Sequence, residues 1–347
     1  MPPIRHTDNP IIKPSDVVPS RSDFEVVCVF NAGVARLGEE VILLLRVAER
    51  PRGSRADRHD APIYNPQTGE VEVKSFHASM PGCDFSDSRF FRTPEGTYLT
   101  SLSHFRVARS RDGIRFDIPE QPSLFPANEY EEFGIEDPRV TKIGDTFYIV
   151  YAAVSRMGIT GYMASTKDFV AFERHGVIFH PTNKDIAIFP EKINGKYYAL
   201  HRPSPVFLGK KDIWLAESPD LHAWGNHRHL IGRAVDGWDS GHVGGSAVPF
   251  RTEQGWLEIY HGVDSNQEYS LGALLLDLEE PWRVLARSKN PIMKPEASYE
   301  KEGFFGNVVF TCGVLVEDGV VKLYYGASDT YIAYAELSLD EILESLV

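Results

Sequence analysis

The residues Gly144-Asp-Thr-Phe-Tyr-Ile-Val-Tyr151 show the pattern from which we predict the fold of this chain. A glycine turn is followed directly by a run of alternating aromatic and aliphatic residues. The same phrase starts at five other places, Gly38, Glu95, Asn194, Gln254 and Asp318. Asn-Gly and Asp-Gly turns beside such runs are hairpin signals, so each copy predicts a β-hairpin.

A second phrase follows several copies of the first. It consists of a short strand, a polar turn with Ser and Asp, and a bulky residue, and it spans Ala108–Phe116, Ala164–Phe169 and Ala216–Trp224. The paired phrases recur every ~50–60 residues, close to the period of propeller blades. A small antiparallel sheet cannot bury both faces alone, whereas radial packing buries them and leaves only short edges. We therefore predict an all-β fold, a β-propeller, with a β-sandwich of irregular hairpins as the alternative.

The blade number follows less directly from the pattern. Six glycine phrases are present, but the first has no clear partner phrase, and a blade shared by the N- and C-terminal strands would give five. Ser338 and Glu341 form a capping box, which predicts a short C-terminal helix. Residues 50–68 are rich in Arg, Asp and Pro and are expected to form a long surface loop, either a lid or a passive insertion. No interdomain linker is visible, so residues 1–347 are expected to form a single domain.

Composition excludes several classes of protein. The 347 residues are 42% hydrophobic, which is enough for a large core, and no stretch approaches the ~18 apolar residues that span a bilayer. The first ten residues contain no apolar signal region, so neither secretion nor a membrane partner is expected. The net charge of −13 argues against a nucleic-acid partner. Three scattered cysteines fit a reducing compartment and offer no disulfide framework.

One carboxylate is a candidate for acid–base chemistry. Asp137 lies in Glu136-Asp137-Pro138-Arg139, just before the Gly144 hairpin. Proline disfavours the helical conformation for the residue before it, so Asp137 is expected to be held in an extended backbone. A carboxylate fixed in this way suits general acid–base catalysis. The alternative is an ordinary Asp-Pro turn.

Basic residues occur at matching ends of successive hairpins despite the negative net charge. They are Arg46, Lys184, Arg202, His242 and His261. In a closed propeller these ends could converge, and like charges held together are costly unless an anion lies between them. Phosphate would satisfy such a cluster through charge-assisted hydrogen bonds. The alternative is that each basic residue pairs with its own carboxylate.

Other chemistries have little support. His201, His242 and His261 come from different blades without metal-ligand spacing, so no metal is expected. The chain has no G-x-S-x-G elbow, Walker A motif or G-x-G-x-x-G sequence. We therefore expect no cofactor.

Several motifs together resemble glycoside hydrolase family 130. They are Phe30-Asn31-Ala-Gly-Val with Arg46-Val47, Glu136-Asp137-Pro138-Arg139, Phe189-Pro190-Glu191-Lys192, His201-Arg202-Pro203 and Tyr260-His261-Gly262. The resemblance extends over roughly residues 8 to 340, with the motifs in the expected order. This family contains inverting β-mannoside phosphorylases and some β-mannosidases. Its fold is a five-bladed β-propeller, which favours five blades over six.

The resemblance implies a mechanism and a set of site residues. Inorganic phosphate, a co-substrate, would attack the anomeric carbon while Asp137 supplies a proton to the glycosidic oxygen through the mannose 3-hydroxyl. Phosphate would be bound by Lys184, Arg202, His242 and His261, although the family usually has Lys or Arg where His242 stands. The mannose ligands would be Asn31, Arg46, Asp185 and Asp329, with Arg139 supporting Asp137.

The retained basic residues favour phosphorolysis over hydrolysis, because an inverting hydrolase needs a second carboxylate to activate water. Ala32 and Glu136 resemble the branch that acts on β-1,2-mannobiose and short β-1,2-mannooligosaccharides. A β-1,4-mannooligosaccharide or mannosyl-glucose phosphorylase, a β-mannosidase and a non-catalytic sugar-binding propeller are the alternatives. The loops at Asp84–Arg92 and 50–68 are expected to form the acceptor subsite. A cytoplasmic location is expected, and a homo-oligomer is left open.

Overall fold

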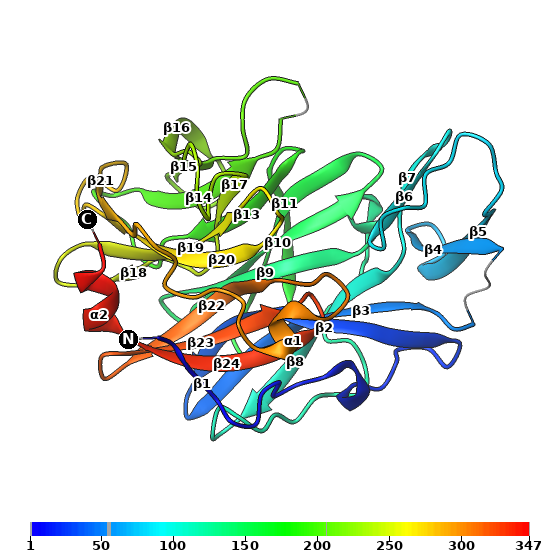
Figure 1. The fold of residues 1–347 in the computed structure, drawn as a ribbon, viewed down its shortest axis with the longest axis horizontal. Coiled ribbons are helices and arrows are strands. Elements are labelled where there is room, and N and C mark those ends of the chain that lie inside the picture. Colours follow the sequence, from blue (N-terminus) through cyan, green and yellow to red (C-terminus); the bar gives the residue numbers. More distant parts are fainter. Residues whose placement is uncertain (1, 54–56, 206, 347) are drawn as a thin grey trace.

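The computed structural model describes residues 2–53, 57–205 and 207–346, and their strands form five sheets around a common centre (Figure 1). The first three blades are β2 (Phe24–Leu37), β3 (Glu40–Pro51) and β8 (Leu102–Ser110); β9 (Ile135–Ile143), β10 (Thr146–Ser155), β11 (Gly158–Thr166) and β12 (Glu173–Phe179); and β13 (Asn183–Ile188), β14 (Tyr197–Pro203), β15 (Ile213–Ser218) and β16 (Gly225–Ile231). The fourth is β17 (His242–Gly245), β18 (Phe250–Arg251), β19 (Trp256–Val263), β20 (Tyr269–Leu276) and β21 (Val284–Arg287), and the fifth is β22 (Val309–Glu317), β23 (Val320–Ala327), β24 (Tyr331–Ser338) and β1 (Ile4–Arg5). The predicted five-bladed propeller is confirmed.

The repeated glycine phrase explains this architecture. Gly38, Gly144, Gly195, Gly255 and Gly319 lie in the turns that lead from the inner strand of each blade toward its second strand. The sixth copy, at Glu95, forms the separate hairpin of β6 (Phe90–Thr93) and β7 (Gly96–Leu99), which lies outside the blades. This is why six phrases produce five blades. The partner phrase of the first blade, Ala108–Phe116, comes late because elements outside the blade, the β6–β7 hairpin among them, lie between β3 and β8 in the sequence.

The fifth blade contains both ends of the chain. β1 pairs with β24 through Ile4 and Glu336, so the first and last strands share one sheet as predicted. The helix α2 (Leu339–Glu344) follows, and the Ser338 side chain accepts a hydrogen bond from the backbone N–H of Glu341. The other short helical segments are η1 (Pro14–Asp16), η2 (Glu129–Glu131) and α1 (Ser298–Lys301).

The prediction of a loop over residues 50–68 is wrong. β3 continues to Pro51, and β4 (Arg58–Asn65) pairs in full register with β5 (Glu70–His77), projecting beside the propeller (Figure 1). Residues 54–56 lie outside the described part of the chain. The hairpin is stable because Ala61 and Phe76 pack on Phe91 of β6. In the sequence, Pro62 obscures the alternation of polar and apolar residues in β4, because proline usually counts against a strand.

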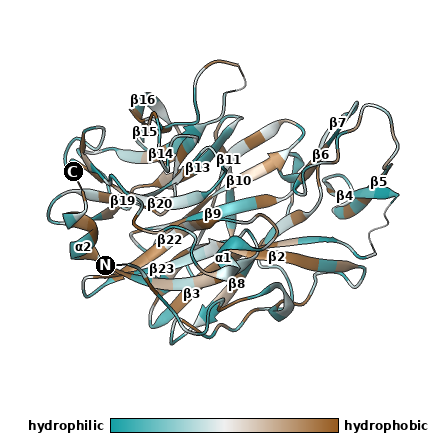
Figure 2. Cartoon of the chain, viewed as in Figure 1, coloured by the Kyte–Doolittle hydropathy of each residue, from teal (hydrophilic) through white to brown (hydrophobic). Residues whose placement is uncertain are grey.

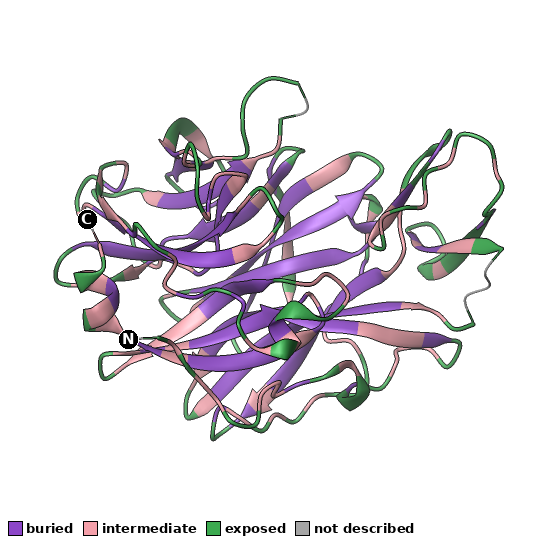
Figure 3. Ribbon diagram, viewed as in Figure 1, coloured by how far each residue is buried: buried purple, intermediate pink, exposed green. Residues whose placement is uncertain are grey.

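The core lies between neighbouring blades. Figure 2 shows apolar residues on the central strands, and Figure 3 shows that the same strands are largely buried while the β4–β5 hairpin carries many exposed residues. Phe189 of the third blade and Trp256 of the fourth meet edge to face with ring centroids 5.3 Å apart. The inner strands β2, β9, β13, β17 and β22 pack against one another, so polar side chains on them are directed to one central region.

Candidate active site

Three polar residues on inner strands have left-handed backbone conformations. Asn31 on β2, Asp137 on β9 and Asp185 on β13 have φ values of 48°, 51° and 54°. Each lies at a register shift of its strand, and Asn and Asp tolerate this conformation better than most residues. The expectation that Pro138 holds Asp137 in an extended backbone is therefore wrong, because the bulge opposite Tyr151 decides its conformation. A bulge re-aims a side chain, here toward the centre of the propeller.

A cavity of about 380 Å³ lies at this position. Its lining includes every predicted site residue except Arg139: Asn31, Arg46, Asp137, Lys184, Asp185, Arg202, His242, His261 and Asp329. Arg139 lies directly behind, where its NH1 donates to the Asp137 carbonyl oxygen at 3.0 Å. The volume falls within the range of small-molecule sites.

Asp137 is held by two donors that use the same oxygen. Asn31 Nδ2 and Arg46 NH1 donate to Asp137 Oδ1 at 3.0 Å and 2.8 Å. Burial alone would raise the pKa of Asp137, but the charges of Arg46, Lys184 and Arg139 outweigh it and lower the pKa. The carboxyl is therefore ionised at neutral pH. Both hydrogen bonds, from Asn31 and Arg46, use Oδ1 rather than Oδ2.

Asp185 is the second carboxylate anchor. It accepts a hydrogen bond from Arg139 NH2 at 3.2 Å and another from Arg202 Nε. Burial opposes its ionisation, but Arg202, His261 and Arg139 hold the pKa of Asp185 well below its usual range. Asp185 is thus a fixed negative charge that orients Arg202.

The basic residues meet in one place, but not as an uncompensated cluster. Lys184 Nζ lies 3.2 Å from Glu136, and Arg46 NH2 lies 2.9 Å from the same carboxylate. Arg202 pairs with Asp185. The arrangement therefore combines the predicted convergence with the alternative in which each cation has a carboxylate partner. Glu136 was not assigned to the site from the sequence, although its position beside Asp137 on a bulged strand could have signalled it.

The two histidines are not positively charged at neutral pH, contrary to the predicted basic cluster. Burial lowers the pKa of His242 to about 4, with help from Arg202 and Lys211. Burial also lowers the pKa of His261, whose Nδ1 is 3.0 Å from Ser246 Oγ. Lys211 has a lowered pKa as well, because partial desolvation and the nearby charges of Arg202 and Lys184 disfavour its charged form.

Asp329 differs from the other carboxylates. Burial, followed by a partial offset from Arg46, raises its pKa to about 7. It lies between β23 and β24 with φ of 50°, so a left-handed conformation again presents a polar side chain to the cavity. Asp329 is therefore the carboxyl of this site whose charge changes near neutral pH.

Arg89 is a lining residue that the sequence analysis did not name individually. It comes from the segment between β5 and β6, where Asp87 holds its guanidinium at 2.8 Å. The guanidinium also stacks over the ring of Phe305, 4.4 Å from its centroid. The excursion from the first blade thus reaches the fifth blade across the cavity, a contact that no local sequence pattern signals.

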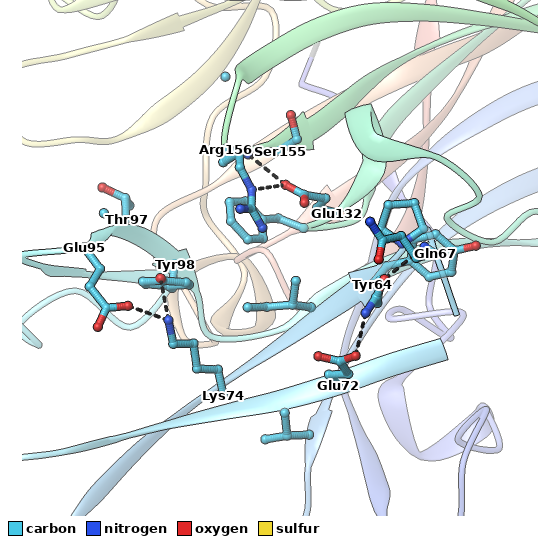
Figure 4. Close-up of a pocket in the computed structure, with 17 residues that line it drawn as sticks. Tyr64, Gln67, Glu72, Lys74, Glu95, Thr97, Tyr98, Glu132, Ser155 and Arg156 are labelled. Carbon is cyan, nitrogen blue, oxygen red and sulfur yellow. Dashed lines mark hydrogen bonds and ion pairs between the residues drawn. The ribbon is translucent and has the colours of Figure 1, made fainter. Parts of the chain in front are cut away.

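A larger cavity, of about 1020 Å³, lies between β4, β5, β7 and the β10–β11 turn (Figure 4). Four of its charged groups form ion pairs, Lys74 with Glu95 at 2.5 Å and Arg156 with Glu132 at 2.8 Å, and Glu72 accepts a hydrogen bond from Asn65 Nδ2. None of the bulged Asn and Asp residues lines it. We therefore place the candidate active site in the smaller, central cavity.

The described residues show neither a metal-ligand cluster nor a membrane-spanning helix. Residues 2–53, 57–205 and 207–346 contain no group of three or more His, Cys, Asp or Glu side chains arranged to hold a metal ion. In the same part of the chain, no helix has both the length and the apolar character needed to cross a bilayer.

Comparison with known proteins shows the family of this chain. A relative from Listeria innocua named beta-1,2-mannobiose phosphorylase is 51% identical over 99% of this chain and 98% of its own length. A 1,2-beta-oligomannan phosphorylase from Thermoanaerobacter sp. is 42% identical over 72% of this chain and 83% of its own. The solved structure of beta-1,2-mannobiose phosphorylase from Listeria innocua in complex with beta-1,2-mannobiose superposes with a TM-score of 0.97 and 50% identity, covering 99% of both chains. Residues 96–347 match the family profile described as beta-1,4-mannooligosaccharide phosphorylase. The chain belongs to glycoside hydrolase family 130.

Proposed function

We propose that this chain is an inverting phosphorylase that cleaves β-1,2-mannobiose, and short β-1,2-mannooligosaccharides, with inorganic phosphate to give α-D-mannose 1-phosphate and mannose. The observation that carries the proposal is that Lys184 and Arg202 line the same small cavity as Asp137. An anion-binding side and a carboxylic acid then lie within reach of one glycosidic bond.

In this mechanism phosphate is the nucleophile. Lys184, Arg202, His242 and His261 bind it, with the two imidazoles acting as neutral hydrogen-bonding groups. A phosphate oxygen forms a bond to the anomeric carbon as the bond to the glycosidic oxygen breaks on the opposite face. Asp185 and Glu136 hold Arg202 and Lys184 in place before the reaction. These cations therefore need not reorganise as the transition state forms.

Asp137 supplies the proton to the departing sugar oxygen. Asn31 and Arg46 hold Oδ1, so Oδ2 carries the proton. Because the surrounding cations favour the ionised form of Asp137, this carboxylate must take up a proton before it can donate one, and phosphate is the acid that supplies it. Asn31, Arg46, Asp185 and Asp329 bind the mannose, and Arg139 supports Asp137 through its carbonyl oxygen.

The linkage is assigned from the similarity to named relatives. The two relatives described above are named for β-1,2 mannosides, whereas the family description names a β-1,4 substrate. The Listeria innocua relative covers almost the whole chain at 51% identity, and we therefore favour β-1,2. Initial rates with β-1,2-mannobiose, β-1,4-mannobiose and mannosyl-glucose at equal phosphate concentration test this choice. The first substrate should be used fastest, and a preference for either of the others would contradict the assignment.

Hydrolysis is the second candidate, and Asp329 is the observation that favours it. A carboxyl with a pKa of about 7 is suited to act as a general base on water. Sugar release in phosphate-free buffer that disappears in Asp329→Asn would support this alternative. Strict dependence on phosphate would exclude it.

The proposal requires no cofactor, because phosphate is consumed as a co-substrate. We place the reaction in the cytoplasm, where a charged sugar phosphate is retained for further use. A homo-oligomer remains an open part of the proposal, and light scattering of the purified protein would decide it.

A further inference from the structure

Glu258 on β19 is a buried carboxyl that the proposed mechanism does not use. It is 0% exposed, and its two neighbours along the strand, Leu257 and Ile259, are fully buried as well. Its Oε1 accepts a hydrogen bond from the Ser246 backbone N–H at 2.9 Å. Its Oε2 has no hydrogen-bond partner among the described residues. Such a group is costly to bury, so its presence calls for a reason.

The stability of the fold is a weak explanation for the carboxyl of Glu258. The Ser246 N–H also donates to the Ile259 carbonyl oxygen at 3.2 Å, so this donor would keep a partner without Glu258. The unpartnered Oε2 also carries a desolvation cost that an apolar side chain of similar size would not carry. The fold alone therefore does not require a carboxyl at this position.

The segment that Glu258 contacts is connected to the active site on both sides. The carbonyl oxygens of Gly245 and Ser246 accept hydrogen bonds from Arg139, at 3.0 Å and 3.2 Å. The same Arg139 holds Asp185 and the Asp137 backbone. The Ser246 hydroxyl is 3.0 Å from Nδ1 of His261, which lines the cavity.

We propose that Glu258 is a positioning residue for the active site: it fixes the Gly245–Ser246 segment, which in turn orients Arg139 and His261. Burial raises the pKa of Glu258 well above its usual range, so the neutral acid is the form present in the resting enzyme. Glutamine reproduces both the size and the hydrogen-bond acceptor of this acid. Methionine reproduces the size alone.

The test compares Glu258→Met, Glu258→Gln and a control, Glu300→Met. Glu300 is also 0% exposed, but both of its oxygens accept hydrogen bonds, from Arg5, Tyr325 and the backbone N–H groups of Glu296 and Ala297. We expect Glu258→Met to raise the KM for phosphate about 10-fold to 100-fold, since small displacements of positioned groups carry effects of that size. Its melting temperature should not fall, and Glu258→Gln should stay within about 3-fold of the wild type in KM. The control should lose melting temperature and keep its KM.

The inference would be overturned if Glu258→Met lost activity only in proportion to the loss of folded protein, with the KM for phosphate unchanged. These kinetics rest on the proposed function, so a second measurement is independent of it. A crystal structure of Glu258→Met should show Ser246 displaced and its contact with Arg139 broken. An unchanged Gly245–Ser246 segment would overturn the positioning role whatever reaction the site performs. Absence of mannose 1-phosphate formation by the wild type would instead refute the proposed function.

Discussion

Replacing Lys184 by methionine tests the anion-binding side of the cavity with little risk to the fold. The Lys184 side chain is 24% exposed and its ammonium lies 3.2 Å from Glu136. When this lysine is removed, Glu136 keeps Arg46 at 2.9 Å, so no buried carboxylate is left without a cation. Methionine also preserves the aliphatic stem that packs in the cavity wall.

The size of the effect follows from the contact that is lost. A hydrogen bond to a charged group contributes about 1.5–3 kcal/mol, which corresponds to roughly 10-fold to 100-fold in affinity. Phosphate must compete with Glu136 for the ammonium, so the lower end of this range applies. We therefore expect the KM for phosphate to rise about 10-fold and the KM for the mannoside to change by less than about 3-fold.

The assay varies phosphate at saturating β-1,2-mannobiose and then varies mannobiose at saturating phosphate. Lys142→Met is the matched control, because Lys142 is an exposed residue of β9 that lies outside the cavity lining. Both variants should melt within a few degrees of the wild type. A phosphate KM that is the same in Lys184→Met and in the control would show that the anion binds elsewhere.

Three further substitutions test other parts of the site. Asp137→Asn keeps a residue that tolerates the φ of 51° and should lower kcat about 10²-fold to 10⁴-fold with an unchanged melting temperature; near-normal turnover would exclude Asp137 as the acid. Asp329 has a pKa of about 7 against 3.8 for an ordinary Asp, so the folded state binds its proton more tightly and loses stability as pH rises through that interval. Asp329→Asn should remove up to roughly 4 kcal/mol of this loss of stability. Chemical denaturation should therefore find the variant more stable than the wild type at pH 8 but not at pH 4. Parallel pH profiles of the two proteins would contradict the pKa shift. Gly244→Ala places a Cβ against Asp185 Oδ2, at a distance no real Cβ contact shows, and should abolish activity. Gly225→Ala, whose Cβ meets nothing within 4 Å, should leave activity unchanged. An active Gly244→Ala would mean that Asp185 can shift without loss of function.

The fold could be predicted from the sequence because one local pattern repeats. The glycine turn and the strand after it need only short-range information, and five of the six copies form the inner hairpins of the blades. The copy at Glu95 has the same local signal but belongs to the excursion from the first blade. Its role depends on where the chain returns to the propeller, which no single hairpin encodes.

The site could be predicted only in part. Asn31, Asp137 and Asp185 were identifiable as polar residues within strand-like stretches, but their left-handed conformations depend on register shifts against neighbouring strands. The neutral state of His242 depends on burial beside Arg202, which only the assembled blades produce. The contact of Arg89 with Phe305 joins residues more than two hundred positions apart.

Nuclear magnetic resonance of one reaction mixture tests the central claim most directly. Purified protein, β-1,2-mannobiose and inorganic phosphate are followed together through the phosphorus and anomeric proton signals, with a parallel sample that lacks phosphate. We expect one α-mannose 1-phosphate for each mannose released, and no release in the parallel sample. Equal release of mannose in both samples, or a β-anomer of the sugar phosphate, would contradict this expectation.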